Sequence, residues 1–113
     1  MLPVHLQNWR ISILDEYKVR LYKRAFKDLD SIYSYIAYEK SAPENAKGQV
    51  DRIKDAILKL DTFPQSHQDR LVGLYAGKGY KQLLVDNYIA IFKIDESKKM
   101  VWVVAVQYYG RDL

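Results

Sequence analysis

GYKQLLVDNYIAIFKID, residues 79–95, carries the clearest structural signal in the chain. Two apolar runs, residues 80–85 and 88–94, flank the dipeptide Asp86-Asn87, which is typical of a tight hairpin turn. The second run is apolar at successive positions, so both of its faces are expected to be buried. We therefore expect residues 88–94 to form a central strand of a sheet.

The segments on either side of this hairpin also predict strands. Residues 100–107 are the last strand, reached through a polar hairpin loop at 95–99. Residues 17–23 alternate between apolar and basic or aromatic side chains, which indicates a strand with one buried face. Residues 65–79 are glycine-rich and predict a loop, within which residues 70–74 are a candidate for a short edge strand.

Between the first strand and this loop the period changes to that of a helix. Residues 25–39 predict an amphipathic helix, with Asp28 and Asp30 near its start, where the helix dipole favours negative charge. Its apolar residues recur at spacings of three and four: Phe26, Leu29, Ile32, Tyr33 and Ile36.

A second helix is expected directly after the first. Ser41 followed by Pro43 and Glu44 predicts a capping box with proline in the first turn, and Phe63-Pro64 predicts the end of the helix. Two helices joined by a short link are expected to pack as an antiparallel hairpin. The apolar stripe of the second helix is Ala46, Val50, Ile53, Ile57 and Leu60.

The element order β-α-α-β-β-β predicts an α+β fold, in which a helical hairpin packs on one face of a mostly antiparallel four-stranded sheet. Residues 17–113 are expected to be one domain, which suits a chain of 113 residues. Residues 1–16 show no clear period and are expected to be an N-terminal extension. A disordered arm, an added strand and a start codon placed too far upstream are the alternatives for them.

Composition narrows the class of protein. The chain has no cysteine and no apolar run near the roughly 20 residues of a membrane span, so we expect a cytoplasmic protein. A net charge of +4 and ten tyrosines fit a polyanionic or acidic partner. The sheet face without helices is expected to bind RNA or an acidic peptide through some of Arg20, Tyr22, Lys81, Lys93 and Tyr108.

Four segments together resemble the RelE/ParE family of toxins from type II toxin–antitoxin systems: residues 17–37, 41–64, 79–95 and 101–113. The resemblance implies a small bacterial protein encoded beside an antitoxin, which wraps the toxin and silences it. RelE-like members cut mRNA on the ribosome without a metal, whereas ParE-like members poison DNA gyrase and are not nucleases.

The resemblance also implies a site at the open sheet face and the C-terminal tail. RNA cleavage needs a base for the 2′-OH, a cation on the phosphate and an acid for the leaving oxygen. The expected catalytic residues are Tyr108, Tyr109 and Arg111, and the expected RNA- or phosphate-binding residues are Lys81, Tyr88, Lys93 and Arg20. No metal or cofactor is expected, and His67 stands alone in sequence as a solvated loop residue.

Several positions depart from the nuclease pattern. Ile89 stands where RelE-like nucleases usually carry an arginine, Leu84 and Val85 stand near a second such position, and the tail has no histidine. The first expectation is a toxin that cuts mRNA on the ribosome and is neutralised by a cognate antitoxin. The alternatives are a gyrase inhibitor without nuclease activity, and a decayed toxin that acts as a co-repressor and meets DNA only through its antitoxin.

Overall fold

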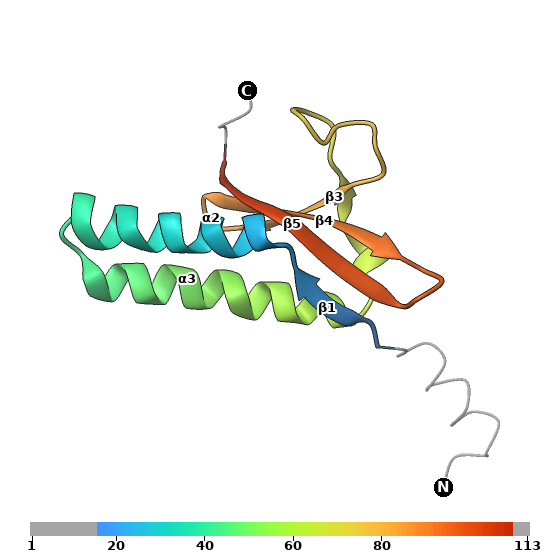
Figure 1. Ribbon diagram of the computed structural model, residues 1–113, viewed down its shortest axis with the longest axis horizontal. Coiled ribbons are helices and arrows are strands. Elements are labelled where there is room, and N and C mark those ends of the chain that lie inside the picture. Colours follow the sequence, from blue (N-terminus) through green and yellow to red (C-terminus); the bar gives the residue numbers. More distant parts are fainter. Residues whose placement is uncertain (1–15, 110–113) are drawn as a thin grey trace, which may run out of the picture.

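The computed structural model of the protein describes residues 16–109, which form a mixed five-stranded sheet with a helical hairpin on one face (Figure 1). The strands are β1 (Lys18–Leu21), β2 (Gln68–Asp69), β3 (Lys81–Val85), β4 (Tyr88–Asp95) and β5 (Met100–Tyr108). The helices are α2 (Lys23–Ser34), its π-helical continuation η1 (Tyr35–Glu39), α3 (Pro43–Leu58), its 3₁₀ continuation η2 (Lys59–Asp61), and the separate 3₁₀ turn η3 (Pro64–Ser66). None of the helices in the described part of the chain is long and apolar enough to cross a membrane.

The strands follow the order β1-β5-β4-β3-β2, with β1 parallel to β5 and the other pairs antiparallel. The prediction that residues 88–94 form a central strand is confirmed, because β4 lies between β5 and β3. The predicted fold class is also confirmed, with one strand more than expected. The extra strand, β2, lies just before residues 70–74, where an edge strand was considered, and pairs Gln68 with Gln82 and Asp69 with Lys81.

The helical hairpin is confirmed, but two predicted helix starts are wrong. Helix α2 begins at Lys23, so Asp28 lies beyond the first turn and does not interact with the helix N-terminus. Helix α3 has Ala42 as its N-cap and no side-chain cap, because Ser41 takes a left-handed φ of 52° one residue outside the helix. The predicted capping box is therefore absent, and Pro43 starts α3 at the position that tolerates a missing N–H.

The two faces of the sheet differ in what covers them. Tyr88, Ala90 and Phe92 of β4 point toward the helices and form the inner face of the sheet, which contributes to the main core. Ile89 and Ile91 point the other way and form the outer face with Val104 and Ala105 of β5. Adjacent residues of β5 share the outer face because a bulge interrupts its pairing with β4 between Ile91 and Phe92.

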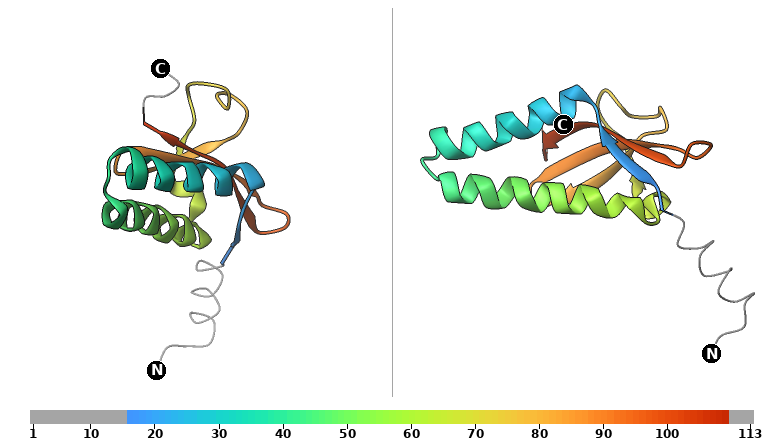
Figure 2. Two further views of the ribbon diagram at one scale, coloured as in Figure 1. Left: turned by 60° about the vertical axis from the view of Figure 1, so that its left-hand side comes forward. Right: turned by 60° about the horizontal axis from the view of Figure 1, so that its bottom comes forward.

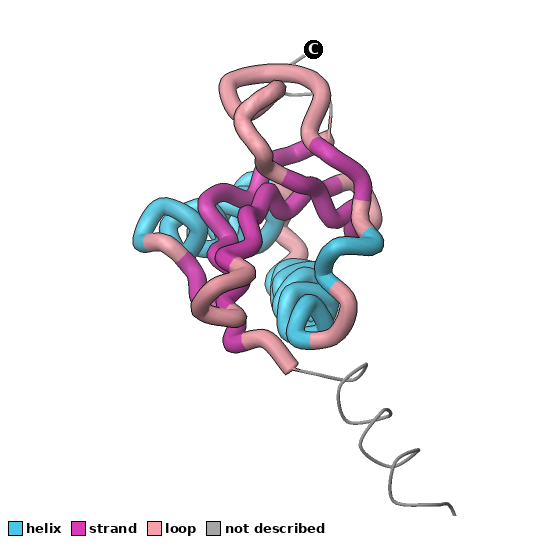
Figure 3. Tube along the Cα trace, turned by 90° about the vertical axis from the view of Figure 1, so that its right-hand side faces the viewer, coloured by secondary structure: helices cyan, strands magenta, loops and turns pink. Residues whose placement is uncertain are grey.

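The outer face is half covered by the loop between β2 and β3, which lies across the sheet from the helices (Figure 3). Tyr75 and Tyr80 of this segment contact each other edge to face, with ring centroids 5.0 Å apart, and pack on the outer-face cluster. The sheet face that the sequence analysis treated as open is thus partly covered by this loop.

Tyr17 fastens the start of β1 to two distant loops. Its hydroxyl donates to Glu96 Oε1 at 2.6 Å and accepts a hydrogen bond from Gln65 Nε2. Its backbone N–H donates to the carbonyl of Asp61 at 2.8 Å. The hydrogen bond from Tyr17 is the largest cause that lowers the pKa of the Glu96 carboxyl, and the bond from Gln65 is the next.

We expect Tyr17→Phe to lower the free energy of unfolding by about 1 kcal/mol, because the ring stays in the core while Glu96 and Gln65 lose a partner. Urea unfolding followed by circular dichroism measures the change. Tyr38→Phe is the matched control, since Tyr38 is 76% exposed and should not affect stability. Equal stability of both variants would show that the hydroxyl network contributes nothing.

Candidate functional site

The helical hairpin extends past the end of the sheet where β4 starts and β5 finishes (Figures 1 and 2). A groove of about 830 Å³ lies between this overhang and the sheet. Its walls are partly apolar and partly polar, and its floor holds two tyrosines. The lining residues are Asp28, Ser31, Ile32, Tyr35, Ile36 and Lys40 from the hairpin, and Tyr88, Val106 and Tyr108 from the sheet.

Two of the predicted site residues, Tyr88 and Tyr108, meet on the floor of this groove. They are paired across β4 and β5, and their rings stand edge to face with centroids 5.7 Å apart. Tyr88 is buried, whereas the side chain of Tyr108 is largely exposed. Burial, and then the neighbouring phenols of Tyr108 and Tyr35, raise the pKa of Tyr88, so it stays protonated at neutral pH and is poorly suited to act as a base.

Asp28 is a groove residue that the sequence analysis assigned to the helix dipole. Its Oδ2 accepts a hydrogen bond of 2.9 Å from the backbone N–H of Val106. Pairing of β1 with β5 ends at Val103, so the edge of β5 beyond it is covered by α2 rather than by a strand. Asp28 therefore supplies a hydrogen-bond acceptor to β5 beyond the point where its backbone pairing with β1 ends. The same side chain places a carboxylate beside the floor of the groove.

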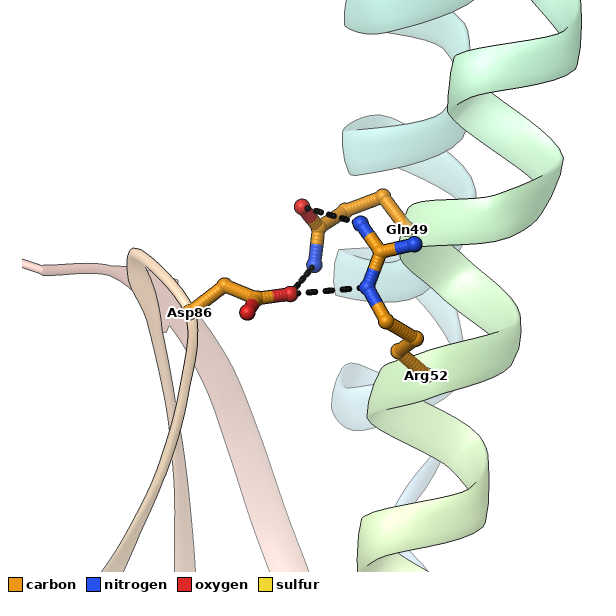
Figure 4. Close-up of polar contacts among 3 residues, drawn as sticks. All are labelled: Gln49, Arg52 and Asp86. Carbon is orange, nitrogen blue, oxygen red and sulfur yellow. Dashed lines mark hydrogen bonds and ion pairs between the residues drawn. The ribbon is translucent and has the colours of Figure 1, made fainter.

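Tyr109, the next predicted catalytic residue, lies just outside the groove. Its backbone N–H donates to the carbonyl of Asn87 at 2.6 Å, which joins the end of β5 to the β3–β4 turn. The β3–β4 turn is itself bound to α3. The carboxylate of Asp86 in this turn accepts hydrogen bonds from Arg52 Nε at 2.9 Å and from Gln49 Nε2 at 3.0 Å (Figure 4). These bonds, the one from Arg52 first, lower the pKa of the Asp86 carboxyl.

Lys81 lies on the inner face at the opposite edge of the sheet, away from the tyrosine pair. Its Nζ donates to the carbonyl of His67 at 3.0 Å and to Asp69 Oδ1 at 2.9 Å, so the cation already has two partners. Of the residues considered for the open face, Lys81 does not share that face with Lys93. Lys81 pairs with Phe92, one residue before Lys93, and successive residues point to opposite faces.

His67 beside Lys81 is half-buried, not fully solvated as expected, and its ring stands edge to face on Phe92 at 5.8 Å. Burial, and then the charge of Lys81, lower its pKa from 6.5. Above its lowered pKa the folded protein keeps His67 neutral, while the unfolded chain takes up a proton near pH 6.5. Stability is therefore expected to fall as the pH drops below about 6.5, where most carboxyl groups are still ionised. His67→Gln should flatten this part of the profile, measured by urea unfolding at several pH values.

The remaining predicted residues lie elsewhere. Arg20 and Lys93 are on the outer face, where Trp102 of β5 pairs with both. Arg111 lies outside the described residues. The predicted site is thus divided among the groove, the β3 edge and the outer face of the sheet.

The outer face at the end of β5 is mostly apolar, although Gln107, the partner of Ile89, is buried there. Ile89, at the position where the resemblance expects a nuclease arginine, is 3% exposed and packs in the cluster that Tyr75 and Tyr80 cover. Leu84 pairs with Ile89 and is exposed at the sheet edge. The buried Arg70 donates to Gln82 Oε1 at 3.1 Å, and Gln82 pairs with Ile91, the next outer-face residue of β4 after Ile89.

The sequence analysis missed most of the groove. Asp28, Tyr35 and Lys40 lie beside the apolar stripe of the first helix; Asp28 was assigned to the helix dipole, and the other two were not considered as site residues. The spacing of seven residues between Asp28 and Tyr35 places them on one helical face, which was an available signal.

The hairpin and the sheet order define a small α+β fold of the RelE/ParE type. A family model described as the ParE toxin of the type II toxin–antitoxin system parDE matches residues 19–113, and the chain belongs to this family. The family membership inferred from the sequence is therefore confirmed. Comparison with curated proteins gave no match.

Solved structures of low sequence identity share the fold. The chromosomal ParDE system from P. aeruginosa aligns with a TM-score of 0.67 and 19% identity, over 84% of this chain and 98% of that chain. The RelBE2 toxin–antitoxin complex from Mycobacterium tuberculosis aligns with a TM-score of 0.60 and 18% identity, over 82% and 91%. A mutant of the E. coli toxin RelE in the free state aligns with a TM-score of 0.57 and 13% identity, over 85% of each chain.

Proposed function

We propose that this toxin inhibits DNA gyrase by binding it, without catalysis, and that a cognate antitoxin silences it by docking in the groove. The observation that carries the first part is the dispersal of the predicted phosphate-binding cations: Lys81 is already paired at the β3 edge, whereas Arg20 and Lys93 lie on the outer face. This choice replaces mRNA cleavage as the leading function and follows the behaviour that the family resemblance implies for ParE-like members.

Cleavage of RNA requires a base, an acid and a cation around one phosphate. The groove brings together Tyr88 and Tyr108, but it also contains the carboxylate of Asp28, which repels a phosphate. Lys40 is the cation that lines the groove, and its Nζ lies 5.5 Å from the centre of the Tyr35 ring. The groove therefore suits a peptide better than an RNA strand.

The chemistry of the groove lining suits an amphipathic segment of an antitoxin. Ile32, Ile36 and Val106 offer apolar contacts, and the tyrosines offer large rings with a polar tip. Asp28 and Lys40 give polar contacts of opposite sign, which can fix the register of a bound segment. Two of the solved structures of this fold, RelBE2 and the archaeal RelE–RelB pair from Pyrococcus horikoshii, are toxin–antitoxin complexes.

The target is tested by adding the purified full-length chain to two reactions: DNA supercoiling by gyrase, and ribosome-dependent cleavage of mRNA. We expect supercoiling to be inhibited, the mRNA to remain intact, and the antitoxin to restore supercoiling. In cells, expression should halt DNA synthesis before protein synthesis in separate pulse-labelling measurements.

Cleavage of ribosome-bound mRNA with unchanged supercoiling would overturn the proposal in favour of the RelE-like activity. If neither reaction changed and cells kept growing, the chain would be a decayed toxin whose remaining role is complex formation with the antitoxin.

A further inference from the structure

The outer sheet face carries a row of aromatic and cationic side chains at the end away from the groove. Trp102 of β5 is the Cα partner of Arg20 on β1 and of Lys93 on β4, so an indole stands between two cations across three neighbouring strands. Strands in a sheet lie about 4.8 Å apart, which keeps the three side chains within reach of one ligand. Trp102 has no part in the groove.

Tyr22, which follows β1, adds a second ring to this row. Its ring contacts Trp102 edge to face, with centroids 5.5 Å apart, and the Nζ of Lys93 lies 5.3 Å from its centre. Tyr22 is 39% exposed, and Trp102 and Lys93 are half-buried. We call Arg20, Tyr22, Lys93 and Trp102 the Trp102 patch.

The patch is positively charged. Arg20 is exposed and has no hydrogen-bond or ion-pair partner among residues 16–109. Lys18 lies on the same face as Arg20, two residues earlier in β1. It pairs with Met100, which lies two residues before Trp102 in β5, so Lys18 adds a third cation beside the patch. The nearby carboxylate of Asp95 accepts hydrogen bonds from Ser97 Oγ at 2.7 Å and from the backbone N–H of Lys98 at 3.1 Å. The net field over the rings therefore favours an anion.

We propose that the Trp102 patch binds a single strand of nucleic acid, with a base stacked on Trp102 beside the ring of Tyr22 and its flanking phosphates on Arg20 and Lys93. Stacking needs an unpaired base, because both faces of a base in a duplex are covered by its neighbours. An acidic peptide would use the cations but not the flat rings between them, so the observations favour nucleic acid. Single-stranded DNA and RNA share this chemistry.

The inference goes beyond the proposed function, because the patch lies on the opposite face of the sheet from the groove. An antitoxin segment in the groove would leave the patch accessible. Nucleic acid is therefore expected to bind both the free toxin and its antitoxin complex. If no binding is found, the gyrase proposal is unaffected.

Fluorescence anisotropy of labelled oligonucleotides about 12 nucleotides long tests the proposal, with DNA single strands, RNA single strands and duplex DNA as separate probes. We expect the full-length chain to bind at least one single strand more tightly than the duplex, and the two single-strand arms identify the source. Trp102→Leu should weaken binding by about 5- to 150-fold with an unchanged salt dependence, because it removes stacking and no charge.

Charge variants should behave differently. Replacing both Arg20 and Lys93 by glutamine is expected to lower the slope of log affinity against log salt by about 1.4, which corresponds to two lost phosphate contacts. Trp102→Phe keeps a flat ring and should retain most of the affinity, which guards against a folding defect in Trp102→Leu. Lys54→Gln is the control, since Lys54 is an exposed cation on α3.

Two results would overturn the proposal. One is binding of the duplex as tightly as the single strands, with Trp102→Leu unaffected, which would indicate nonspecific attraction to charge. The other is equal binding of a polyglutamate peptide through the same cations, which would identify an acidic protein as the ligand.

Discussion

Tyr108→Ala is expected to weaken binding of the cognate antitoxin by about 30- to 1,000-fold, the effect of losing a central aromatic anchor. Tyr108 lies on the floor of the groove with 56% of its surface exposed, so its ring is available to a partner. Its other side packs on Tyr88, which holds the ring in place without a large loss of side-chain entropy on binding.

The neighbouring residue provides the matched control. Tyr109 has the same side chain and is 57% exposed, but it does not line the groove. Tyr109→Ala should therefore leave antitoxin affinity within a few-fold of the parent value. Isothermal titration calorimetry with the purified antitoxin measures both affinities, and urea unfolding verifies that both variants are folded.

Equal losses in the two variants would place the antitoxin on the tail in general and not in the groove. No loss in either would move the docking site elsewhere. In cells that express both proteins, the antitoxin should silence Tyr108→Ala less effectively than Tyr109→Ala.

The sheet was predictable where the signal is local. Residues 88–94 are apolar at successive positions, which requires two covered faces, and β4 has them. The alternation of Val19 and Leu21 likewise predicted which side of β1 faces the helices. By contrast, β2 consists of Gln68 and Asp69, two exposed polar residues at the edge of the sheet. Because neither side chain is buried, the sequence shows no alternation of apolar residues that would predict this strand.

The groove depends on contacts between residues far apart in sequence. Asp28 meets the backbone of Val106 from a position 78 residues away, where β1 has ended and α2 crosses β5. No periodicity within the helix indicates this partner. The length of the overhang, which creates the groove, is likewise a property of the packed hairpin and not of either helix alone.

The predicted site was divided because strand register determines the face of each side chain. Lys81 and Lys93 are on adjacent strands, yet they are offset by one position and point to opposite faces. The bulge in β5 then returns Tyr108 to the inner face with Val106. Neither the offset nor the bulge can be read from composition, so residues expected on one surface occupy two.

Phe92→Ala is expected to lower the free energy of unfolding by about 3–5 kcal/mol, the usual cost of emptying a buried aromatic site. Phe92 is completely buried in the inner face of β4, at the centre of the sheet, and it also supports the ring of His67. The free energy of unfolding of a small domain is only about 5–15 kcal/mol, so this variant should unfold at a markedly lower urea concentration.

Two further variants separate burial from residue type. Phe26 on α2 is 55% exposed, although its spacing predicted a core position, and Phe26→Ala should cost less than about 1 kcal/mol. Phe92→Leu retains most of the buried volume and should fall between the two alanine variants. If Phe26→Ala proved as damaging as Phe92→Ala, α2 would have to be rotated so that Phe26 enters the core. Rotation would also carry Asp28 away from Val106, so the same unfolding series tests the helix orientation that forms the groove.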